Sequence, residues 1–202
     1  PPHPLVAAAV RAPARLEALA RTGFLDGRRD DALDRLTGLA TRLLGVPLAL
    51  VSLVDADRQV FASVSGALPE PWGSRRATPL SHSFCQHVVG RGGPLVVADA
   101  RRDTVLCDSP AIPDLGVIAY AGAPIRAADG APIGSLCAID HAPRRWRPEE
   151  VEVLQALSEL ATRELERHAA LAALREREAL LAQFVEHAPA AVAMFDRGLR
   201  CL

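Results

Sequence analysis

The 202-residue chain contains no lysine, because all 23 of its basic residues are arginine. With 24 acidic residues the formal net charge is -1, so we expect neither a basic face nor a nucleic-acid partner. No apolar run approaches the roughly 18 residues that cross a membrane. The first ten residues also lack the charged and apolar regions of a signal peptide. These absences predict a cytoplasmic protein with no membrane segment.

Cysteine is scarce, with one residue each at positions 85, 107, 137 and 201. No two of them are close enough in sequence for a CxxC redox motif or a zinc motif. The first three lie in apolar surroundings, so we expect buried, reduced thiols.

Two amphipathic segments open the chain. Apolar residues at Leu16, Leu19 and Ala20 predict a short helix that ends near Gly23. A second helix is predicted over 31–44, where the apolar residues share one face: Leu33, Leu36, Leu39, Ala40, Leu43 and Leu44. Asp30 or Asp31 can cap its start and Gly45 its end.

Five segments have the composition of strands. The run 48–56 is apolar at nearly every position, which indicates a central strand, and 59–66 alternates as an antiparallel partner should. The other strands are predicted over 94–100, 117–127 and 132–140, and Asp129–Gly130 is a hairpin signal between the last two. We therefore predict an α+β fold, with an antiparallel sheet of five to six strands flanked by helices.

The stretch "LSHSFCQHVV", residues 80–89, concentrates polar and nucleophilic side chains. We expect a short helix there, capped by Ser81 or Thr78. At 100° per residue, Cys85 falls on the apolar face, whereas Ser83 and His87 fall on the opposite side. His82 and Cys85 could chelate a metal from adjacent turns, but His87 points elsewhere, so three ligands do not converge. No third group orients a serine–histidine pair. We therefore predict no metal site and no catalytic residues in this segment.

Residues 149–188 contain neither glycine nor proline and predict a helix about 57 Å long. Its first half has a packing face, and Leu171, Leu174, Leu181 and Val185 continue in steps of three and four. Such a rod cannot bury its apolar seam alone, so we expect a parallel coiled coil in a homodimer. The alternative is a helix that folds back onto its own domain.

Several segments, in order, resemble the GAF domains of bacterial sensor proteins. They are "DALDRLTGLATRLLGVPLALVSLVDADRQVFAS", "PLSHSFCQHVV", "PLVVADARRD", "AYAGAPI" and "IGSLCAIDHAPRRWRPEEVEVLQALSELA". The segment "FVEHAPAAVAMFDRGLRCL" resembles the start of a PAS domain. The resemblance implies an N-terminal extension (1–13), a GAF domain (14–166), a helical linker (167–187) and a truncated PAS domain (188–202).

The resemblance also implies a ligand cavity on one face of the sheet. The candidate pocket residues are Ser83, Cys85, His87, Asp99, Asp103 and Tyr120. The chain lacks the Cys–His pair and the Asp-Ile-Pro motif of bilin-binding relatives. Without lysine, it also lacks the Asn-Lys-Xaa-Phe-Asp-Glu signature of the cyclic-nucleotide subgroup. The ligand and any cofactor therefore stay unidentified.

The function expected from these features is sensory and regulatory, without enzymatic activity in this part of the chain. A small molecule, or none, would set the state of a dimeric helix that feeds PAS and output domains. One alternative is a reductase of the free methionine sulfoxide type that uses Cys85 and Cys107. The other alternative is a ligand-free dimerisation scaffold.

Overall fold

A six-stranded antiparallel sheet forms the centre of the computed structural model, which describes residues 4–187, with side chains up to 184. The strand order is β3-β2-β1-β6-β5-β4. The strands are β1 (Leu48–Val54), β2 (Arg58–Ser65), β3 (Ala77–Pro79), β4 (Leu95–Val97), β5 (Ala119–Arg126) and β6 (Pro132–Asp140). The predicted α+β class and strand number are confirmed. The sixth strand, β3, lies outside the five segments with the composition of strands.

The apolar content of the strands explains their positions in the sheet. All seven residues of β1 are buried, as expected for a strand between two neighbours and two covered faces. The predicted hairpins β1–β2 and β5–β6 both form, and Gly130 supplies the positive φ of +84° in the second turn. The predicted strand 94–100 is shorter, because the 3-10 helix η2 (Ala100–Arg102) begins inside it.

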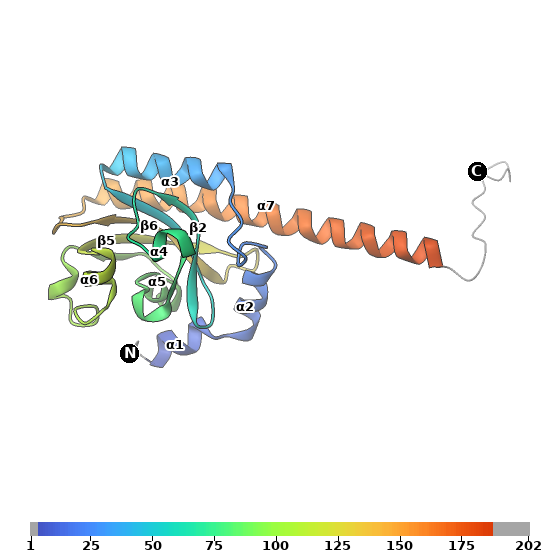
Figure 1. Cartoon of the computed structure of the whole chain (residues 1–202), viewed down its shortest axis with the longest axis horizontal. Coiled ribbons are helices and arrows are strands. Elements are labelled where there is room, and N and C mark those ends of the chain that lie inside the picture. The colour runs from blue at the N-terminus through green and yellow to red at the C-terminus, as the bar shows by residue number, and fades with distance from the viewer. Residues whose placement is uncertain (1–3, 188–202) are drawn as a thin grey trace.

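Helix α3 (Asp31–Leu44) and the first half of α7 (Pro148–His187) cover one face of the sheet (Figure 1), and α2 (Pro13–Ala20) adds Ala18 and Leu19 to the core on that side. Asp30 caps α3 by accepting the backbone N–H groups of Ala32 and Leu33, and Gly45 ends it at φ +61°. This layer contains one hydrophobic core, which includes Leu33, Leu154 and Leu165.

Short helices cover the other face (Figure 1). They are α1 (Pro4–Val10), α4 (Trp72–Arg75), η1 (Leu80–His82), α5 (Cys85–Arg91) and α6 (Ala111–Leu115), together with η2. The expected single helix over 80–89 is wrong in detail, because the chain extends at Ser83 between η1 and α5. Neither Ser81 nor Thr78 caps α5. Instead the Ser83 hydroxyl accepts the backbone N–H of Gln86 at 3.1 Å.

The N-terminal segment is part of the domain. Helix α1 packs against α5, with Val6 and Val10 buried. The contact is so close that a methyl group on Gly90 would overlap Val6. Glycine is therefore required where α5 meets α1.

Helix α7 begins on the sheet and then leaves the domain. Pro148 occupies the first helical turn, and the Glu150 side chain accepts the backbone N–H of Arg147 at 2.8 Å. The helix packs on the sheet as far as Leu165 and then projects from the body (Figure 1). Residues 171–184 are all exposed. The predicted long C-terminal helix is confirmed, because α7 is continuous from Pro148 to His187. Among the described residues, no helix is both long and apolar enough to cross a membrane.

Candidate functional site

A small cavity lies between the sheet and the short helices. Its free volume is about 20 Å³, which is enough for one water molecule. Strands β1, β2, β5 and β6 form its floor, and η1, α5 and α6 contribute to its walls. The lining residues are Leu48, Leu50, Gln59, Phe61, Leu68, His82, Phe84, Cys85, Leu115, Val117, Tyr120, Cys137 and Ile139.

Gln59 organises the polar part of the cavity wall. Its Oε1 accepts hydrogen bonds from the hydroxyls of Ser52 at 3.0 Å and Ser83 at 2.7 Å. Its Nε2 donates to Thr78 Oγ1 at 2.8 Å. All four side chains are buried, and their mutual hydrogen bonds offset the free-energy cost of removing their polar groups from water. The network fixes the segment before α5 against strand β2.

Two thiols and one phenol also meet at the cavity wall. Cys85 Sγ lies 3.9 Å from Cys137 Sγ, and the Tyr120 hydroxyl donates to Cys85 Sγ at 3.4 Å. Hydrogen bonding by Cys137 lowers the pKa of Cys85 to about 7 against the opposing effect of burial, and Tyr120 contributes in the same direction. The same pairing raises the pKa of Cys137, and burial raises the pKa of Tyr120. The two thiols therefore titrate as a coupled pair, in which ionisation of one opposes ionisation of the other.

His82 connects two elements that line the cavity. Its Nδ1 lies 3.0 Å from Ser81 Oγ, and its Nε2 lies 3.0 Å from Asp114 Oδ2. The Trp72 ring packs on the imidazole with centroids 5.0 Å apart. This bridge holds α6, which carries Asp114, against η1.

The structure places the six predicted pocket residues in different environments. Cys85 and Tyr120 line the cavity, and Ser83 reaches it through its hydrogen bond to Gln59. Asp99 caps η2 and pairs with Arg101, and Asp103 accepts the backbone N–H groups of residues 105 and 106. Neither carboxylate is part of the lining, because each is occupied at a surface turn.

His87 lies outside the lining and is nevertheless buried. Gly90, one helical turn later, contacts α1, so α1 covers the side of α5 that the sequence assigned to the less apolar face. Burial and the charge of Arg91 lower the pKa of His87, and Asp103 partly opposes them. His87 was a candidate pocket residue, and the structure places it outside the lining of this cavity.

The sequence pointed to the wrong partner for Cys85. The expected Cys85–Cys107 pair is absent from the described residues, because Cys107 is exposed in the loop before α6. Cys137 takes its place from β6, where it is paired in register with Leu50 and Gly122. The predicted strand over 132–140 was the available signal, but it did not show which helix the Cys137 thiol would face.

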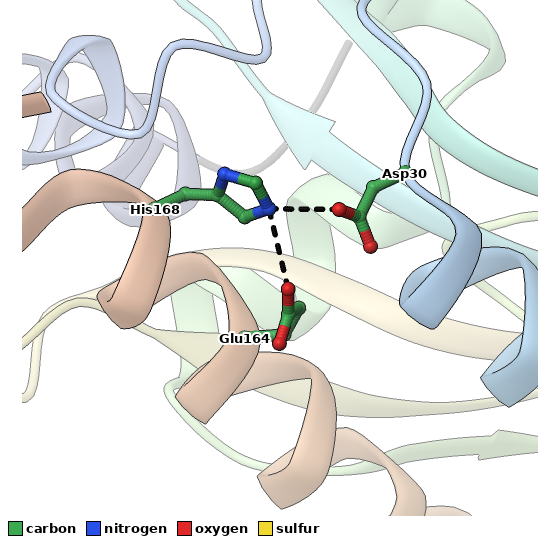
Figure 2. Close-up of side chains that lie close together, drawn as sticks. All are labelled: Asp30, Glu164 and His168. Atoms are coloured by element: carbon green, nitrogen blue, oxygen red, sulfur yellow. Dashed lines mark hydrogen bonds and ion pairs between the residues drawn. The ribbon is translucent and has the colours of Figure 1, made fainter. Parts of the chain in front are cut away.

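A second cluster lies where α7 leaves the domain (Figure 2). His168 Nε2 is 2.8 Å from Asp30 Oδ2 and 3.2 Å from Glu164 Oε1. Burial raises the pKa of Asp30, but hydrogen bonds from Leu33, His168 and Ala32 outweigh it and hold that pKa below its ordinary value. Mainly by hydrogen bonding, Arg167 lowers the pKa of Glu164. Both carboxylates are thus held in the charged form.

The GAF domain family model matches residues 28–165, and the chain belongs to this family. A cyclic di-GMP phosphodiesterase of Pseudomonas aeruginosa is 35% identical over 123 residues, which are 60% of this chain and 20% of that protein. The chain thus spans about a fifth of the length of this relative.

Solved structures share the fold at low sequence identity. The PixJ GAF domain of Thermosynechococcus elongatus matches with a TM-score of 0.55 and 19% identity, covering 88% of this chain and 98% of that one. The free methionine-R-sulfoxide reductase of Neisseria meningitidis matches with a TM-score of 0.53 and 20% identity, covering 77% and 91%. A GAF domain of a Coxiella burnetii phosphoenolpyruvate-protein phosphotransferase matches with a TM-score of 0.57 and 17% identity, covering 81% and 96%.

Proposed function

We propose that this GAF domain is a sensory module that forms a parallel homodimer through α7. The state of its cavity would be relayed along that helix to further domains. The observation that carries the proposal is the change along α7 after Leu165. Up to Leu165 the apolar residues of α7 pack on the sheet. Beyond it, Leu171, Leu174 and Leu181 are exposed at heptad spacing.

The exposed leucines need a partner helix, because a row of apolar side chains on a projecting rod is unfavourable in water. Leu171, Leu174 and Leu181 fall at successive a and d positions of one heptad frame, and Glu178 occupies the remaining a position. A two-fold parallel pair buries this seam in both protomers and presents both C-terminal ends to the same side. That arrangement suits the delivery of a signal to paired output domains.

Ligand entry requires the cavity to open. A volume of about 20 Å³ holds no organic ligand, so η1 and α6 would have to separate. The contact to break is the bridge between His82 and Asp114, beside Trp72. The occupant would be a small, largely apolar molecule, because most of the lining is aliphatic or aromatic and the polar groups of Gln59 already have partners.

The output belongs to the rest of the protein. The similarity to a cyclic di-GMP phosphodiesterase supports a role in controlling the turnover of that nucleotide. Residues 188–202, predicted to begin a PAS domain, lie outside the described residues. We expect cytoplasmic localisation and a regulatory rather than catalytic role for the GAF domain itself.

Two measurements test the proposal. Light scattering at high protein concentration is expected to give twice the 21.5 kDa of one chain, and a stable monomer would overturn the dimer. Native mass spectrometry of protein purified from its own host is expected to show a retained small molecule. The bare chain mass would instead favour a ligand-free scaffold.

A second candidate function rests on the thiol pair. With Cys85 as nucleophile and Cys137 3.9 Å away as the resolving thiol, a sulfoxide would lose its oxygen to Cys85 as a sulfenic acid. Cys137 would then displace water to form a disulfide, and an external dithiol would reduce it. An NADPH-coupled thioredoxin assay with free methionine sulfoxide tests this function, and absence of turnover removes it.

A further inference from the structure

The cluster at the base of the projecting helix contains three good metal-binding groups from two separate parts of the chain. Asp30 precedes α3, whereas Glu164 and His168 lie one turn apart on α7, 134 and 138 positions later (Figure 2). Their ligand atoms all lie within 4.8 Å of one another. None of the three belongs to the cavity or is needed for the proposed seam.

Local contacts hold each group in position. The Asp30 Oδ1 atom is engaged by the backbone N–H groups at the start of α3, which leaves Oδ2 directed at His168. Residues 164 and 168 share one helix face because they are four residues apart. The Phe24 ring and the imidazole pack edge to face, with centroids 5.1 Å apart, and His168 is 8% exposed. The site is therefore preorganised rather than assembled from mobile surface chains.

We propose that Asp30, Glu164 and His168 bind a divalent first-row transition-metal cation, with Zn²⁺ as its best probe. One imidazole nitrogen and two carboxylate oxygens form an accepted donor set for this class, which leaves a further position for water. Bonds of about 2.1 Å in a tetrahedral site separate neighbouring ligand atoms by about 3.4 Å. The observed separations from His168 Nε2, 2.8 and 3.2 Å, are shorter than this value, so the ligand atoms would move slightly apart around a cation.

Arg167 is the competitor for the same carboxylate. Its guanidinium donates to Glu164 Oε1 and lies 3.3 Å from His168 Nε2, where it would face the cation. The Arg167 side chain is 54% exposed, so it can turn towards solvent when a metal enters. We therefore expect an exchangeable site in which Arg167 weakens metal binding.

Metal binding would fasten α7 to α3 at the last turn that touches the domain. Beyond His168, residues 171–184 are exposed, so this clamp sets the direction in which the helix leaves. The binding event itself is independent of dimerisation and of a cavity ligand. It can therefore fail or succeed separately from the proposed sensory function.

Isothermal titration of the full chain with Zn²⁺, after chelator treatment, tests the site. The wild type is expected to bind one equivalent at this site. His168→Gln and Asp30→Asn are each expected to weaken Zn²⁺ binding at least about 100-fold. Loss of a group that only supports a metal ligand weakens binding by up to about 100-fold, and loss of a ligand itself should cost at least as much. Asp30→Asn keeps the helix cap, because asparagine caps as well as aspartate. His141→Gln, which changes a histidine outside the cluster, is expected to bind as the wild type does.

Arg167→Gln distinguishes a metal-binding cluster from one that only stabilises the fold. Removal of the competing cation is expected to tighten Zn²⁺ binding, whereas it would leave binding unchanged if the metal sat elsewhere. Co²⁺ in place of Zn²⁺ is expected to show no thiolate charge-transfer absorption, since the donors are nitrogen and oxygen. Three results would each overturn the proposal. They are undetectable Zn²⁺ binding by the wild type, unchanged affinity in His168→Gln, and thiolate absorption by Co²⁺ that survives in His168→Gln.

Discussion

The apolar seam of α7 permits a quantitative prediction for Leu174→Glu combined with Leu181→Glu. The two leucines are 52% and 58% exposed in the single chain, so a partner helix can bury about half of each. Full burial of a leucine stabilises by about 1.5–3 kcal/mol, so half of it is worth about 1 kcal/mol. Two leucines in each of two protomers then contribute about 4 kcal/mol, which corresponds to about a thousandfold in the dimer dissociation constant.

Sedimentation equilibrium over a dilution series measures this loss. Leucine and glutamate have similar helix propensities, so circular dichroism and thermal unfolding of the monomer are expected to stay unchanged. The matched control is Ala172→Glu with Ala179→Glu, which adds the same charge at exposed positions outside the seam. Equal dissociation constants for the two double variants would refute the assignment of the seam.

Two further predictions concern α7 and the thiols. Glu150→Gln is expected to destabilise the domain by about 1 kcal/mol at neutral pH, because it removes charged hydrogen bonds to Arg144 and Arg147. Burial raises the pKa of Glu150, but hydrogen bonds from Arg147 and Arg144 lower it overall. Its stabilisation is therefore present above the ordinary pKa of 4.5 and is lost as pH falls through the lowered pKa. The acid unfolding curves of variant and wild type should then converge. A difference in stability that stays constant with pH would contradict this reasoning. In native protein, iodoacetamide with peptide mapping is expected to label exposed Cys107 and to spare buried Cys85 despite its pKa of about 7; rapid labelling of Cys85 would show that the cavity opens readily.

Features with a strong local pattern could be predicted from the sequence. The helix over 31–44 has both a capping aspartate and a terminal glycine, and the hairpin at Asp129–Gly130 has a glycine where the turn needs a positive φ. Strand β3 could not be predicted, because three residues, one of them proline, carry no periodicity. It forms because β2 presents an edge that the passing chain can pair with.

The candidate site depended on contacts between distant segments. Helical projection correctly placed Cys85 towards the core, but it could not show that α1 packs on α5 or that His87 is buried. The thiol partner of Cys85 lies 52 positions away, and His168 meets Asp30 across 138 positions. Periodicity describes one element at a time, so pairs of this kind appear only once the elements are packed together.

The most direct test of the central claim is a disulfide cross-link at position 174. In a parallel, in-register dimer the two copies of a d position face each other, close enough for a disulfide after small adjustments. Leu174→Cys, in a background with Cys107→Ser and Cys201→Ser, is therefore expected to give a covalent dimer on mild oxidation. Ala172→Cys in the same background should remain monomeric on a non-reducing gel. Equal cross-linking of the two variants, or none at Leu174→Cys, would contradict a parallel coiled coil through α7.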